Sequence, residues 1–242
     1  MYNVNVITIT FREEEKMAKR GIQPSGIQTR KKMLHAAVIS FLEKGYQNTT
    51  IAEISRAAGM ATSAFFRAYS DKEAVLLELV KIMFGSQFSL AEKLIDTEDP
   101  VMLYAAETSL QVCIAETSEA LRDLYVTAYS LPSTSEFIYR STAMKLEKIF
   151  AEYLPDAVSK DFYELDIATS GIVRGYMQRK SDFYFTVENK ISRLLNCCLK
   201  IYNVPESKVK AALELVRALD LETIAKEIVA ETVRASEEGT LL

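Results

Sequence analysis

The chain has 242 residues, a formal net charge of −4 and 49% hydrophobic residues, which allows one or two domains with a sizeable core. Its apolar runs fall short of the roughly 20 residues that a membrane-spanning helix needs, so we expect a soluble protein with no membrane partner. Three cysteines, two of them adjacent, argue against a disulfide framework. We therefore expect a cytoplasmic location.

The first 28 residues are expected to form a flexible N-terminal arm. Residues 1–11 alternate like a strand but have no partner strand, and they lack the basic start of a signal peptide. Met17 opens a stretch typical of a protein start, so we expect translation to begin there. The basic residues Lys19, Arg20 and Arg30 to Lys32 either contact a polyanion or form a solvated tail.

Residues 47–72 predict two short helices joined by a turn at Gly59. Thr50 and Glu53 have the spacing of a capping box, in which side-chain oxygens satisfy the first free backbone N–H groups, so a helix should begin near Thr50. Gly59 supplies the left-handed backbone that ends it. The pattern is that of a helix-turn-helix, although two ordinary bundle helices would give the same spacing.

The second helix of this pair is expected to begin at a cap formed by Thr62 or Ser63, with Phe65 and Tyr69 facing inward. Its outward residues suit a DNA major groove, because they combine hydroxyls, a ring and a guanidinium. These candidate base-reading residues are Thr62, Ser63, Phe66 and Arg67.

Charge favours a nucleic-acid partner for this segment. Residues 17–72 contain nine Lys or Arg against three acids, a net charge of +6, which leaves about −10 for the rest of the chain. One basic segment in an acidic protein is expected where a single face meets a polyanion.

Residues 29–80 resemble the tetracycline-repressor-like (TetR) family of transcriptional regulators. The resemblance follows the order of a basic helix start, AA-x₃-F, GY-x₂-TT, I-x₃-AG, an aromatic pair and SDKEAVL. It implies an all-α fold with a three-helix helix-turn-helix head at residues 29–75, whose first helix spans residues 30–44. A larger helical domain for effector binding and dimerisation would occupy residues 76–242.

The resemblance also assigns roles to residues of the head. Thr50 and Lys72 match positions that usually touch phosphates, and the four outward residues of the second helix match positions that approach bases; Arg30, in the basic segment, is a further candidate DNA contact. Phe66 replaces a residue that usually carries a hydroxyl. It either packs on sugar or a thymine methyl or lies partly in the core, and Arg67 then takes over part of the polar readout.

The chain beyond residue 71 predicts a succession of helices, the last four at about residues 159–179, 186–202, 206–218 and 221–237. Bundles of the resembled family usually enclose an effector pocket, although each large side chain could equally be core or rim. The candidate ligand-binding residues are Phe84, Phe88, Tyr104, Glu107, Tyr125, Tyr129 and Arg174.

A homodimer is expected, because one recognition helix covers few base pairs and a twofold pair reads two half-sites. Residues 167–177 and 191–201 carry apolar and small residues for a four-helix interface. The interface candidates are Gly171, Gly175, Leu194, Leu195, Cys198 and Ile201.

We expect no enzyme, no cofactor and no metal site. The single histidine, His35, has no metal-ligand partner at suitable spacing, and no phosphate-binding glycine loop or nucleophile elbow is present. The sequence predicts a ligand-responsive transcriptional regulator that binds a palindromic DNA operator and is released by a small-molecule effector. Ligand-promoted binding is equally compatible, and the alternative class is a helical protein-interaction module with a basic N-terminal region.

Overall fold

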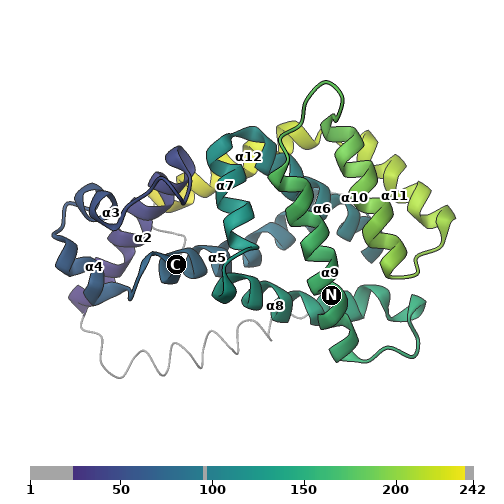
Figure 1. Ribbon diagram of the computed structural model, residues 1–242, viewed down its shortest axis with the longest axis horizontal. Coiled ribbons are helices and arrows are strands. Elements are labelled where there is room, and N and C mark those ends of the chain that lie inside the picture. The colour runs from purple at the N-terminus through teal and green to yellow at the C-terminus, as the bar shows by residue number, and fades with distance from the viewer. Residues whose placement is uncertain (1–23, 95–96, 238–242) are drawn as a thin grey trace.

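The computed structural model describes the backbone of residues 24–94 and 97–237, and the side chains of residues 25–83 and 97–235. The expected arm at residues 1–28 therefore lies almost wholly outside the described residues, as does the proposed start at Met17. Helices and the turns between them make up the described part, which contains no strand. The all-α prediction is confirmed, with a small head at one end of an elongated helical body (Figure 1).

Three helices form the head: α2 (Pro24–Lys44), α3 (Ile51–Ala57) and α4 (Thr62–Ala68). Helix α2 begins six residues before the predicted position 30. The apolar stripe of α2 is fully buried, with Ala37 and Phe41 at 0% exposure, and it packs with Ile54 of α3 and Phe65 of α4 in the same core. This core fixes the angle between α3 and α4.

Backbone signals set the boundaries of α3 and α4. Thr50 caps α3 as predicted: its hydroxyl accepts from the N–H of Glu53 at 3.2 Å, and the Glu53 carboxylate accepts from the N–H of Thr50 at 2.9 Å. Gly59 has a φ of +68° in the turn, as expected. The predicted cap of α4 is wrong, because Ala61 holds the extended cap conformation and Thr62 is already helical.

The body contains the remaining helices, of which the last four lie within a residue of their predicted bounds. Helix α6 is its centre and contacts α7 to α12, and no described helix is both long and apolar enough to cross a bilayer. Helix α12 runs along α6 and reaches α2 (Figure 1). The elements are α5 (Lys72–Leu94), α6 (Pro100–Thr117), α7 (Glu119–Ala128), α8 (Pro132–Phe150), η1 (Ala151–Tyr153), α9 (Ser159–Gln178), α10 (Val187–Ile201), α11 (Glu206–Ala218) and α12 (Leu221–Glu237).

Helix α7 of the body holds the turn that follows α2. The Asp123 carboxylate accepts from the backbone N–H of Gln47 at 2.8 Å. Gly45 lies beneath the same carboxylate with a φ of +82°, and a Cβ at this position would lie 2.7 Å from Asp123 Oδ2. Within the body, Glu73 at the start of α5 accepts from the backbone N–H of Ser133 of α8 at 3.2 Å. The head is thus attached to the body through the polar contact of Asp123 with the turn after α2.

The interface prediction is partly wrong. Leu194, Leu195 and Cys198 are 0% exposed because they pack in the protomer's own core, so they are not available to a partner. Gly171 and Gly175 are exposed on α9, as an interface would need.

Candidate DNA-binding surface and effector cavity

Helix α4 presents the four predicted base-reading residues to solvent. Ala64 and Phe65 face the core, whereas Thr62, Ser63, Phe66 and Arg67 are all exposed. Phe66 does not lie in the core, since its exposure is 57%, and its ring lies edge-to-face against the Phe65 ring. No described residue pairs with Arg67, so its guanidinium is available to a ligand such as a base edge or phosphate.

Arg30, in contrast, is engaged within the protein. Its guanidinium donates to the carbonyl oxygen of Ala68 at 2.8 Å, pairs with the Glu78 carboxylate and lies 4.3 Å above the Tyr69 ring. These contacts join α2, the end of α4 and α5. In the structure Arg30 holds the end of α4 against α5, and a phosphate would have to compete with Glu78 for its guanidinium.

Lys72 is similarly occupied. Its ammonium donates to the carbonyl oxygens of Tyr46 and Thr49, both at 2.7 Å, and lies 4.1 Å from the Tyr46 ring centroid. Burial lowers the pKa of Lys72, against the opposing effect of nearby acids. Two of its three protons hold the turn before α3, which leaves one for a phosphate.

Thr50 is exposed, but its hydroxyl belongs to the capping box. It donates to Glu53 Oε2 at 2.8 Å and accepts from the backbone of the same residue. Hydrogen bonds from the Thr50 side chain and backbone and from Lys44 lower the pKa of Glu53 to about 2. The predicted DNA contacts therefore divide into an exposed set on α4 and a set, Arg30, Thr50 and Lys72, that also supports the position of α3 and α4.

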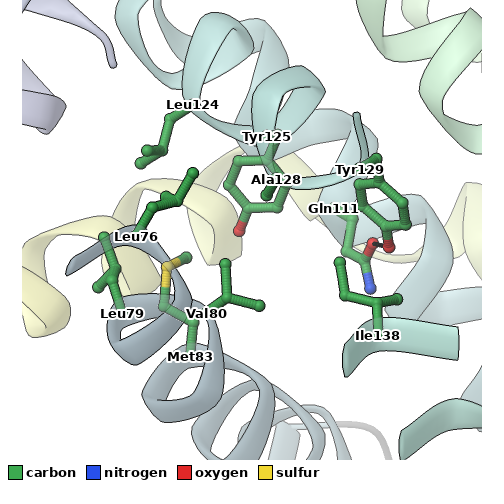
Figure 2. Close-up of a pocket in the computed structure, with 10 residues that line it drawn as sticks. All are labelled: Leu76, Leu79, Val80, Met83, Gln111, Leu124, Tyr125, Ala128, Tyr129 and Ile138. Carbon is green, nitrogen blue, oxygen red and sulfur yellow. Dashed lines mark hydrogen bonds between the residues drawn. The ribbon is translucent and has the colours of Figure 1, made fainter. Parts of the chain in front are cut away.

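The body contains an apolar cavity between α5, α7 and α8, closed at one side by Gln111 of α6. Figure 2 shows side chains of α5 facing those of α7 across it. The cavity volume is about 50 Å³, enough for a few water molecules. The lining residues are Leu76, Leu79, Val80, Met83, Gln111, Leu124, Tyr125, Ala128, Tyr129 and Ile138.

A second cavity of about 40 Å³ adjoins the first and is more polar. The two share Gln111, Tyr129 and Ile138, and the Tyr129 hydroxyl donates to Gln111 Oε1 at 2.7 Å. Burial raises the pKa of Tyr129, so its hydroxyl remains a donor at neutral pH. The second cavity adds polar and charged side chains, among them Tyr104, Glu107, Thr108, Thr142, Lys145, Asp166, Thr169 and Ser170.

The structure thus gathers four of the seven predicted ligand residues around the cavities: Tyr104, Glu107, Tyr125 and Tyr129. Arg174 lines neither; it is exposed on α9 and reaches Ser130 Oγ at 3.5 Å. The side chains of Phe84 and Phe88 lie outside the described residues.

Sequence reasoning missed Asp166 and Gln111. Asp166 lies on the buried stripe of α9, four residues after Phe162 and seven before Val173, and this periodicity was the available signal. Within the described side chains, no cluster of three His, Cys, Asp or Glu is arranged to hold a metal ion.

Known proteins similar in sequence were found for the helix-turn-helix head and for part of the body. Residues 33–79 match the family model described as bacterial regulatory proteins, tetR family. Two curated relatives from Bacillus subtilis (strain 168) are named uncharacterized HTH-type transcriptional regulators. YdgC is 30% identical over 97 residues, 37% of this chain and 50% of its own length. YerO is 24% identical over 163 residues, 62% of this chain and 55% of its own, so the chain spans about half the length of these relatives.

The fold extends to a solved structure. The crystal structure of RolR in complex with the ligand resorcinol matches with a TM-score of 0.61 at 16% identity, covering 81% of this chain and 96% of that chain. The head and the helical body therefore share the overall fold of that structure. The segment at residues 33–79 is therefore similar to the N-terminal domain of bacterial regulatory proteins of the tetR family.

Proposed function

We propose that the protein is a transcriptional repressor that binds a palindromic DNA operator as a homodimer and is released by a small-molecule effector in the cytoplasm. The observation that carries this proposal is the outward face of α4, where Thr62, Ser63, Phe66 and Arg67 are exposed together on a helix whose opposite face is buried. Such a helix enters a major groove with hydroxyl, ring and guanidinium groups directed to base edges.

The dimer is supported by the solvent side of α9. Ile167 is 43% exposed, and the small residues Ala168, Gly171 and Gly175 follow it on the same exposed face. Small residues permit close helix packing. Phe183 and Tyr184, in the turn before α10, are also almost fully exposed and would be covered by a partner next to this face.

Release by an effector is supported by the position of the apolar cavity. It lies between α5, which continues directly from the head, and α7, which holds the turn at Gln47 through Asp123. A ligand that separates α5 from α7 would favour a different position of the head. Because the ligand would bind this second conformation more tightly, it would lower the affinity of the protein for the operator. The RolR structure was solved with resorcinol, which supports a small organic molecule as the occupant here.

A mobility-shift assay on DNA upstream of the protein's own gene, with salt titration, tests the proposal. We expect a preferred palindrome and an affinity that falls steeply with salt, because Lys and Arg contacts release counterions. Equal binding to every duplex of the same length, or no binding at low salt, would instead favour the helical protein-interaction module.

A further inference from the structure

Asp166 is a buried carboxylate with one unused oxygen. It is 4% exposed, and its Oδ1 accepts from Ser170 Oγ at 3.2 Å and from Thr169 Oγ1 at 3.3 Å. Its Oδ2 has no hydrogen-bond partner among the described residues. Buried polar atoms in native proteins are nearly always hydrogen-bonded, so an orphaned carboxylate oxygen calls for a donor from outside the chain.

Asp166, which carries the unused oxygen, lines the second cavity. Glu107 of α6, 6% exposed, lines the same cavity, and Lys145 of α8 is the only positively charged group in its lining. When Asp166 is ionised, the two carboxylates outnumber the one ammonium and leave the lining negative. The adjoining first cavity is lined mainly by aliphatic and aromatic side chains, and both cavities share Gln111 and Tyr129.

We propose that the effector is an organic amine whose ammonium group donates to Asp166 Oδ2 and whose apolar part occupies the first cavity. This inference rests on the proposed function of the cavities as the effector site. A protonated amine supplies both the missing donor and the charge that the lining lacks, and a charge-assisted hydrogen bond in a buried site is stronger than a neutral one. A carboxylate ligand would meet two like charges there.

The size of the cavities adds a structural consequence. Their volumes of about 50 and 40 Å³ hold water molecules rather than an organic ligand. The amine therefore enters only as the walls separate, and α5 and α7 form opposite walls of the first cavity. Occupation of the site therefore requires the walls formed by α5 and α7 to move apart.

Three probes of one skeleton test the ligand class: phenethylamine, phenethyl alcohol and phenylacetate. Each is titrated into the protein by calorimetry without DNA, at a pH above 7, where Asp166 is ionised. We expect the amine to bind about tenfold or more tightly than either of the others. The proposal is overturned if the alcohol or the acid binds as tightly as the amine, or if the amine does not bind at millimolar concentration. This comparison needs no variant.

The Asp166→Asn variant locates the interaction. Its amide oxygen can still accept from Ser170 and Thr169, while an N–H₂ replaces the unused oxygen. We expect the amine to lose about 10- to 100-fold in affinity and phenylacetate to gain on it, so that their order reverses. Glu164→Gln, on the exposed face of α9, is the matched control and should change neither. An unchanged order in folded Asp166→Asn would refute the assignment.

Failure of this inference is distinguishable from failure of the proposed function. All titrations use the protein alone, whereas the proposed function is tested by DNA binding. Operator binding with no preference for the amine would overturn the ligand class only.

Discussion

Arg30, Arg67 and Lys72 are alike in charge but differ in their surroundings. The guanidinium of Arg30 is held by Glu78 and the Ala68 carbonyl, and the ammonium of Lys72 by two backbone carbonyls. Arg67 has no such contacts in the described structure. The energetic cost of recruiting a side chain that is already hydrogen-bonded is higher, so base recognition should concentrate on Arg67 and its neighbours on α4.

Asp166 should make the stability of the protein depend on pH. Burial raises its pKa from 3.8 to about 7, against weaker opposing hydrogen bonds from Ser170 and Thr169. Between these values the unfolded chain has released the proton that the folded protein keeps, so stability falls as pH rises from about 4 and levels off above about 7. The ionisable or charged groups around Asp166 are Tyr104, Glu107, Tyr129, Lys145, Cys198 and Tyr202.

The Asp166→Asn variant lacks this titration. We predict that its free energy of unfolding, relative to the wild type, increases between about pH 4 and pH 8 by an amount on the order of 2–4 kcal/mol. Urea denaturation at both pH values measures it. Parallel pH profiles for the two proteins would show that Asp166 ionises normally in the folded state.

At the scale of single elements, Thr50 and Thr62 differ in their roles. Thr50 is the N-cap of α3, whereas Thr62 is the first residue of α4. Thr50→Ala removes the cap of α3 and should lower the free energy of unfolding by about 1 kcal/mol. Thr62 makes no capping bond, so Thr62→Ala should leave stability unchanged and weaken DNA binding. Denaturation and DNA titration of both variants check this pair, and a loss of stability in Thr62→Ala would contradict it.

The contact of Gly45 with α7 gives a second element-level prediction. Gly45→Ala adds a Cβ 2.7 Å from Asp123 Oδ2 at a φ of +82°, and should destabilise the protein by about 1–3 kcal/mol. Part of this loss is steric and should be recovered when Asp123→Ala is added, which a double-mutant cycle measures. Gly171→Ala, with open space around its Cβ, is the control. If the losses of unfolding free energy in the two single variants are strictly additive, Asp123 does not hold the head against the body.

Local features of the fold could be predicted from sequence, because they depend on neighbours in the chain. The cap at Thr50 and the turn at Gly59 each depend on residues within a few positions in the chain. The engagement of Arg30 and Lys72 depends on partners 23 to 48 residues away, which no local pattern reveals. The prediction that Leu194 and Leu195 lie in a dimer interface is wrong for a related reason. An apolar stripe does not show whether the chain's own core or a partner covers it.

At the scale of the whole molecule, the exposed small residues of α9 make the assembly testable. Gly171 has open space around its Cβ, so Gly171→Arg should fold normally and yet disrupt a close helix interface. Sedimentation should give twice the chain mass of 27.2 kDa for the wild type and a single chain mass for the variant. A wild type that sediments at 27.2 kDa at micromolar concentration would refute the homodimer.

The most direct test of the account is the affinity of Arg67→Ala for the preferred palindrome, measured beside Arg217→Ala. Both residues are exposed arginines, but Arg217 lies on α11 of the body. The account predicts a loss of about 10- to 100-fold for Arg67→Ala, with relaxed preference at one base pair, and little change for Arg217→Ala. Equal affinity and equal base preference in the two variants would contradict the claim that the outward face of α4 reads DNA.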